Sequence, residues 1–99
     1  MAIYKYSKLA DADLEGIAEY TVVNFGERQA RAYREALDQS ARTVANFPTM
    51  GRAYTTKTGT VFLKYNVGGH ALFYQPTDEG IFIVRVLHQM MDFDRHLGA

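Results

Sequence analysis

The spacing of the apolar residues predicts helices in the first half of the chain and strands in the second half. In the segment "ADADLEGIAEYTVVNFG", apolar or small residues recur three or four positions apart and so line one face of a helix. Asp11 is predicted as the N-cap residue, and Gly26 is predicted to end the helix in the left-handed conformation. The predicted apolar face consists of Leu14, Ile17, Ala18, Thr21 and Phe25.

A second and longer helix is predicted for residues 27–47, which read "ERQARAYREALDQSARTVANF". Pro48 ends it, because proline has no backbone N–H to continue the helical hydrogen bonds. Only Gly26 and its neighbours separate the two helices, so they are expected to form a tight antiparallel hairpin. The predicted apolar stripe of this helix consists of Ala30, Tyr33, Leu37, Ala41, Val44 and Phe47.

After Pro48 the period of the apolar residues changes to two, which is typical of strands. Gly68 and Gly69 are predicted to supply the positive φ angles of a hairpin turn. The segment "AYTTKTGT" adds a possible further short strand with a turn at Gly59. The other predicted strands are Ile3–Ser7 near the N-terminus and then residues 60–67, 70–75 and 80–88.

The order of these elements predicts one α+β domain over residues 1–99. It contains an N-terminal strand, a two-helix antiparallel hairpin and then a three- to four-stranded antiparallel sheet. Each predicted helix has an apolar face that must be buried, so both are expected to cover the same face of the sheet.

The charge balance narrows the possible partners. Eleven Lys and Arg residues meet eleven Asp and Glu residues, whereas a protein that binds nucleic acid unaided usually has a basic surface. Stable direct binding to nucleic acid is therefore not expected. The chain has no cysteine, no membrane-spanning apolar run, no signal-peptide pattern and no spacing typical of a metal or cofactor site, so we expect a cytoplasmic protein without a cofactor.

Arg85 interrupts the apolar strand "IFIVRVLH" and is the first candidate for chemistry. Strict alternation along a strand places it on the same face as Ile81, Ile83 and Leu87. Two interpretations are open. Arg85 extends from the rim of the sheet or pairs with an acid, or it contacts a phosphate or a carboxylate of a partner.

His88 ends the same strand, where a ribonuclease would place its general acid. The candidate residues for RNA cleavage lack an obviously paired acid or tyrosine, so a hydrogen-bonded structural histidine is the favoured interpretation of His88. These candidates are Arg52, Lys57, Lys64, Arg85 and His88.

The segment "QMMDFDRHL" predicts a short amphipathic tail after the last strand. Its apolar side chains either close the core or contact a partner, because methionine is common at adaptable binding surfaces. These side chains are Met90, Met91, Phe93 and Leu97.

Five segments with characteristic residues occur in a fixed order: "LADADLEGIAEY", "FGERQARAYREAL", "FPTMGR", "HALFYQ" and "IVRVLHQMMDFDRHL". Each alone is a weak signal, but the ordered set, ending in R-V-L-H-x-x-M-D, is fairly specific. Together the segments resemble the ParE toxins of the RelE/ParE superfamily over nearly the whole chain.

This resemblance implies a non-enzymatic bacterial toxin of a type II toxin–antitoxin system. Such a toxin traps the complex of DNA gyrase with cleaved DNA and blocks replication, and a ParD-type antitoxin neutralises it in a hetero-oligomeric complex. RelE-type relatives share the fold but cleave mRNA on the ribosome, which is the first alternative, with Arg85 and His88 as the catalytic residues. A non-toxic module that only binds its antitoxin is the second alternative.

Binding of an antitoxin or target would give a role to several of the candidate cations and methionines. The residues predicted to bind it are Arg31, Arg52, Lys64, Arg85, Met90 and Met91. Lys64 departs from the resemblance, since many ParE-like sequences have arginine at this position. Lysine keeps the charge but loses the planar fork of the guanidinium group.

Overall fold

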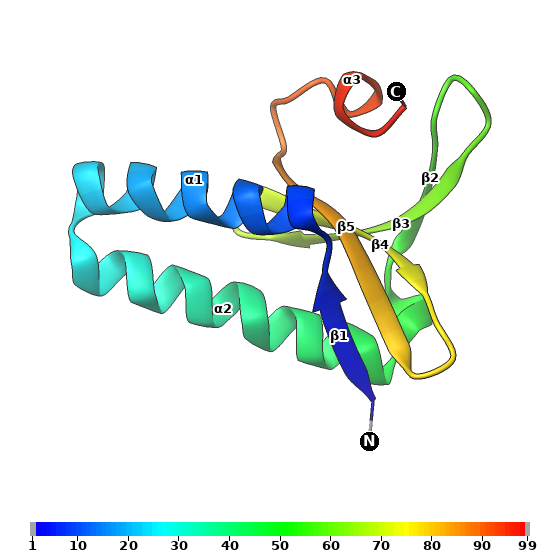
Figure 1. Cartoon of the computed structure of the whole chain (residues 1–99), viewed down its shortest axis with the longest axis horizontal. Helices are drawn as coiled ribbons and strands as arrows, with labels where there is room; N and C mark the ends of the chain where they lie inside the picture. The colour runs from blue at the N-terminus through cyan, green and yellow to red at the C-terminus, as the bar shows by residue number, and fades with distance from the viewer. Residues whose placement is uncertain (1, 99) are drawn as a thin grey trace.

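The computed structural model describes residues 2–98 and follows the predicted order of a strand, a helix hairpin and then further strands (Figure 1). The fold class predicted from the sequence is confirmed. The elements are β1 (Ile3–Tyr6), α1 (Lys8–Phe25), α2 (Glu27–Asn46), the short 3-10 helix η1 (Pro48–Met50), β2 (Arg52–Thr55), β3 (Val61–Val67), β4 (His70–Pro76), β5 (Gly80–His88) and α3 (Phe93–Leu97).

Helix α1 begins one turn earlier than predicted. Ser7 is the N-cap residue, and its Oγ accepts a hydrogen bond from the Ala10 N–H at 3.0 Å. The prediction of Asp11 as the N-cap is wrong, because Asp11 already lies in the first turn of the helix. The end of α1 is confirmed: Gly26 has a φ of 92°, and its N–H donates to the carbonyl of Val22.

The described residues form a five-stranded sheet in the order β1-β5-β4-β3-β2. Strands β2 to β5 are antiparallel neighbours, whereas β1 pairs with β5 in the parallel direction. Close approach of these two strands depends on Gly80, since an added Cβ there would lie 1.8 Å from the Ile3 carbonyl oxygen. In the β3–β4 turn, Gly68 has the predicted positive φ of 56°, but the same prediction for Gly69 is wrong.

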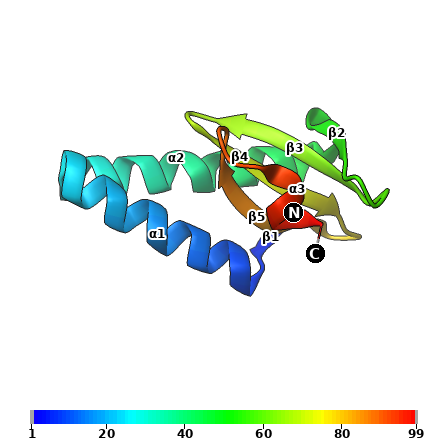
Figure 2. The same ribbon diagram turned by 90° about the horizontal axis from the view of Figure 1, so that it is seen from above.

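Helices α1 and α2 cover one face of the sheet, which we call the helix face, as predicted. The closed end of their hairpin projects beyond the sheet (Figure 2). Phe25 lies at this projecting end and is 68% exposed, and Phe47, just after α2, is 63% exposed. Both belong to the apolar faces predicted from the sequence, and the expectation that these faces are buried is wrong for these two residues. The buried cluster of the helix face consists of Ala10, Leu14, Leu37, Ala41, Val44, Ala45, Leu72, Tyr74, Ile81, Ile83 and Val86.

The opposite face, which we call the tail face, has a smaller buried cluster of Phe62, Ala71, Phe73 and Leu87. Phe93 and Leu97 of α3 pack against it. The register between β4 and β5 shifts here, because Phe73 lies opposite Arg85 while Tyr74 lies opposite Ile83. Strict alternation along β5 is therefore wrong beyond Ile83: Leu87 belongs to the tail face and Val86 to the helix face.

Candidate functional site

An open groove lies between helix α1, the end of β5 and the segment that leads to α3. It encloses about 530 Å³, and we call it the α1 groove. Its wall on α1 is formed by Ala12, Gly16 and Tyr20, which are spaced four residues apart and so share one helix face. Val86 and Met91 line the other side. Because Leu14 and Thr21 on the inner face are buried, α1 has a second, exposed stripe of small and aromatic residues.

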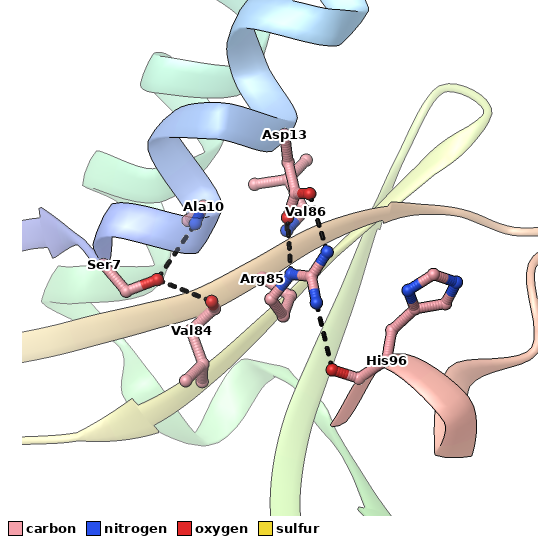
Figure 3. Close-up of polar contacts among 7 residues, drawn as sticks. All are labelled: Ser7, Ala10, Asp13, Val84, Arg85, Val86 and His96. Atoms are coloured by element: carbon pink, nitrogen blue, oxygen red, sulfur yellow. Dashed lines mark hydrogen bonds and ion pairs between the residues drawn. The ribbon is translucent and has the colours of Figure 1, made fainter. Parts of the chain in front are cut away.

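Asp13 and Arg85 form an ion pair beside this groove (Figure 3). The Arg85 Nε donates to Asp13 Oδ2 at 2.8 Å, and Nη2 donates to Oδ1 at 2.9 Å. The remaining nitrogen, Nη1, donates to the carbonyl oxygen of His96 at 3.0 Å. The side chains are only 15% and 13% exposed, and the hydrogen bonds that Arg85 donates to Asp13 raise the pKa of Arg85. The pairing of Arg85 with an acid is thus observed, and its predicted contact with a partner stays a prediction.

Asp13 and Ser7, the N-cap residue of α1, form hydrogen bonds along the edge of β5 beyond the end of β1. The Ser7 N–H donates to the Ile83 carbonyl at 2.9 Å. The Ser7 Oγ donates to the Val84 carbonyl at 2.6 Å, as Figure 3 shows. Next, Asp13 Oδ2 accepts the Val86 N–H at 2.9 Å. One carboxylate therefore connects α1, β5 and, through Arg85, the tail. Sequence reasoning did not identify Asp13 as a site residue, because nothing local indicates a partner 72 residues away.

His88 lies beside a second histidine that appeared isolated in the sequence. His70 and His88 are opposite residues of β4 and β5, and their ring centroids are 5.2 Å apart. His70 Nδ1 lies 2.6 Å from the Tyr33 hydroxyl. Burial, followed by the neighbouring His88, lowers the pKa of His70. His88 Nδ1 accepts the Met90 N–H at 3.1 Å, so this ring has a hydrogen-bonding role in the turn, and catalysis by His88 stays a prediction.

Two of the predicted cations form a row across the tail face with Arg85. Arg52 lies opposite Lys64, Lys64 opposite Phe73, and Phe73 opposite Arg85 in the register of the sheet. An open hollow of about 490 Å³ lies at Arg52 and Lys64. The Lys64 Nζ is 5.4 Å from the centre of the Phe93 ring, a cation–π distance. Partner binding by Arg52 and Lys64 stays a prediction.

The remaining predicted residues lie apart from this row. Arg31 is on the surface of α2, where its Nη1 is 4.0 Å from Glu27 Oε2 and its side chain is 75% exposed. Met90 is 86% exposed, and Met91 is exposed at the α1 groove. The two roles predicted for the tail therefore fall to different residues. Phe93 and Leu97 close the core, whereas the exposed methionines are available for contact with a partner.

Two further features are absent from residues 2–98. The structure has no group of three or more His, Cys, Asp or Glu side chains there that could hold a metal ion. None of the helices in this range is sufficiently long and apolar to cross a membrane.

A helix hairpin on one face of a mostly antiparallel sheet, with an α1 groove beside it, defines an α+β protein with a surface suited to a protein partner. Residues 4–93 match the family of the ParE toxin of the type II toxin–antitoxin system parDE, and the chain belongs to this family. The resemblance recognised in the sequence is thereby confirmed. The chain is a ParE toxin of a type II toxin–antitoxin system.

The similar proteins align with nearly the full length of the chain. The chain is 41% identical to Toxin ParE1 of Mycobacterium tuberculosis over 95 residues, which are 95% of this chain and 96% of that protein. It is 33% identical to Toxin ParE1 of Caulobacter vibrioides over 99 residues, 99% of this chain and 100% of that protein. A chain in the solved chromosomal ParDE toxin–antitoxin system from P. aeruginosa has a TM-score of 0.70 at 17% identity, covers 89% of this chain and 96% of its own, and shares the fold.

Proposed function

We propose that this toxin acts in the cytoplasm as a non-enzymatic inhibitor of DNA gyrase, and that a ParD-type antitoxin neutralises it in a hetero-oligomeric complex. Membership of the ParE family over residues 4–93 supports this function. The ordered segments that resemble gyrase-poisoning ParE toxins extend over the same range.

The Asp13–Arg85 ion pair is the observation that supports gyrase, and not mRNA, as the proposed target. A ribonuclease would need Arg85 to neutralise the scissile phosphate. Here each of its three nitrogens already donates a hydrogen bond within the protein, and the pair is largely buried. A phosphate that bound Arg85 through the same bidentate contact would displace Asp13 and leave its largely buried carboxylate without a charge partner. This arrangement favours a structural role for Arg85.

We assign the α1 groove as the main docking surface for the antitoxin. Ala12 and Gly16 are small and four residues apart, so the backbone of a partner helix can approach α1 closely between the larger side chains of Tyr20 and Met91. A helix placed in an apolar groove is a recurring mode of peptide recognition. Because the groove lies beside the Asp13–Arg85 pair, its walls on α1 and β5 are held at a fixed separation.

The target is tested by inducing the chain without antitoxin and pulse-labelling DNA and protein synthesis. We expect DNA synthesis to stop first, and purified toxin to inhibit supercoiling by gyrase. If translation stops first, the chain is an mRNA endonuclease of the RelE type, and Arg85 and His88 become the residues to replace. If growth continues with the folded chain present, the chain is a non-toxic module that only binds its antitoxin.

The docking surface is tested with Gly16→Leu, using Gly16→Ala as the matched control. An added Cβ at Gly16 meets no atom within 4 Å, so the alanine fits without a clash, and the leucine extends from an open position on α1. Both variants should stabilise α1 by roughly 0.5–1 kcal/mol, because glycine is a poor helix former. Only the leucine fills the groove, and we expect it to weaken antitoxin binding at least about tenfold. Equal affinity of the two variants would exclude the groove as the docking surface.

A further inference from the structure

We infer that the outer edge of β2, together with Arg52 and Lys64, binds an extended, acidic peptide segment of the antitoxin. This inference rests on the proposed antitoxin and adds a second contact surface, on the far strand of the sheet from the β1–β5 pair. The occupant is identified by its chemistry, which is a strand with a carboxylate where it passes Arg52.

The two cations face each other without a neutralising acid. Arg52 and Lys64 are opposite residues of neighbouring antiparallel strands, and like charges in such positions repel each other. Among the ion pairs of residues 2–98, neither cation has an acidic partner. Arg85, in the same row, is by contrast paired with Asp13. The unbalanced positive charge of the row is therefore concentrated at β2 and β3.

The surroundings of this cation pair suit a ligand that lies along the surface. Met50, Tyr65 and Asn66 complete the lining of the open hollow, and Met50 is 44% exposed. The Phe93 ring limits the positions of the Lys64 ammonium group without removing its charge. A single carboxylate placed in the hollow would reduce the repulsion between both cations.

The free strand edge identifies the ligand as a peptide. Strand β2 is the last strand of the sheet, so half of its peptide groups point away from β3 and are open to pairing. An added peptide strand satisfies these groups, whereas a nucleic acid does not. The zero net charge of the chain also argues against unaided binding to a polyanion. A charged edge repels other basic edges and admits an acidic strand.

The register of the sheet also indicates the residue pattern of the ligand. Side chains of a strand alternate between the two faces, and Arg52 and Tyr54 both belong to the tail face of β2. An added strand with an acid beside Arg52 therefore places its residue two positions along beside the half-buried Tyr54 ring. We expect that residue to be apolar.

The test compares two doubly charge-reversed toxins of equal net charge. Arg52→Glu/Lys64→Glu alters the proposed site, and Arg28→Glu/Lys5→Glu alters exposed cations on α2 and on the opposite edge strand β1. We expect the first variant to bind the ParD-type antitoxin about tenfold more weakly than the second at about 0.05 M salt. The difference should become smaller at about 0.5 M salt, where surface charges are screened.

A second arm uses a defined probe and does not depend on the antitoxin. An acetylated peptide of about eight residues, alternating valine and aspartate, is titrated into isotope-labelled full-length toxin and compared with its asparagine counterpart. Chemical-shift changes at the β2 amides with the aspartate peptide alone support the inference. Equal changes with both peptides, or none at β2, overturn the acidic site.

The outcomes separate this inference from the proposed function. If the wild type binds antitoxin and both charge variants bind equally well, the β2 surface is wrong and the α1 groove is unaffected. If wild type and both variants fail to bind antitoxin while the peptide result holds, the site is correct and the proposed partner is wrong. If a DNA oligonucleotide binds the wild type and competes with the aspartate peptide, the ligand is a phosphate backbone and the peptide assignment is overturned.

Discussion

The two faces of the sheet are covered in different ways. On the helix face, α1 and α2 contribute 18 and 20 residues of helix and enclose a cluster of eleven buried residues. On the tail face, α3 has five residues and none of them is buried. The helices α1 and α2 are held on the sheet by the large apolar area that they bury, whereas α3 buries too little apolar area to be held in the same way.

Polar contacts compensate for the small apolar area that α3 buries. Its Asp94 carboxylate accepts hydrogen bonds from the Tyr54 hydroxyl and, at 2.8 Å, from the Lys57 N–H. At its other end, the carbonyl of His96 accepts a hydrogen bond from Arg85. Apolar burial depends little on pH or on any single partner, but these contacts depend on both. The comparison therefore predicts a helix face that is robust and a tail whose position depends on a few groups.

The largest loss of stability is expected from a cavity on the helix face. Leu37 is fully buried between α2 and the sheet, so Leu37→Ala should lower the free energy of unfolding by about 3 kcal/mol. Chemical denaturation measures this change. Leu9→Ala is the matched control, since Leu9 is 60% exposed on α1. Equal losses in the two variants would show that the helix face is not the main source of stability.

The next largest effect is expected where the two covers are connected. Asp13→Ala leaves the largely buried Arg85 without its acid and also removes the acceptor for the Val86 N–H, so we expect a loss of about 2–3 kcal/mol. In contrast, Glu27→Gln, which affects the exposed pair with Arg31, should change stability by less than about 0.5 kcal/mol.

A double variant separates the charge of this connection from its shape. Asp13→Leu/Arg85→Met removes both charges and should regain part of the stability lost in Asp13→Ala. Both variants lack the acceptor for the Val86 N–H. If the double variant is less stable than Asp13→Ala, the hydrogen bond from Arg85 to the His96 carbonyl therefore matters more than the unpaired charge.

A smaller and local effect is expected on the tail face. Phe93 packs against the rings of Tyr54 and Phe73, with centroid distances of 5.6 and 4.8 Å, but it is only half-buried. Phe93→Ala should cost about 1–2 kcal/mol and increase hydrogen exchange in α3. The amides of α2 should keep their protection. Loss of protection in both regions would show that the two covers unfold together.

The difference between the faces also explains which parts of the fold could be predicted from sequence. Periodicity identified the helix hairpin and the main strands because long amphipathic segments bury one side. It failed at Phe25 and Phe47, which lie at the ends of the two helices and are mostly exposed. It also failed beyond Ile83, because a register shift depends on the neighbouring strand and not on β5 alone.

The candidate site was predictable only as far as its residues are unusual in their local sequence. Arg85 was recognisable as a cation in an apolar strand, but Asp13 was not recognisable as its partner because acids are common in the first turns of helices. The His70–His88 pair and the row from Arg52 to Arg85 arise from strand register. A single sequence without covarying partners does not contain that register.

The smallest effect is a dependence of the tail on pH. The Tyr54 hydrogen bond, followed by the Lys57 N–H, lowers the pKa of Asp94. A carboxyl group whose pKa is lower in the folded state stabilises that state above its unfolded pKa, and this contribution is lost as the pH falls through the folded value. The hydrogen bond to Asp94 also raises the pKa of Tyr54, so the tyrosine contribution is present below its unfolded pKa and is lost as the pH rises through the folded value.

We therefore expect amide exchange in α3, after correction for intrinsic rates, to be slowest between these limits. Asp94→Asn should remove the increase of α3 exchange at low pH. Tyr54→Phe should weaken the increases at both low and high pH, while exchange in α2 stays unchanged. If exchange in α3 of Asp94→Asn still increases at low pH as in the wild type, α3 is held by Phe93 packing and the Arg85–His96 contact alone.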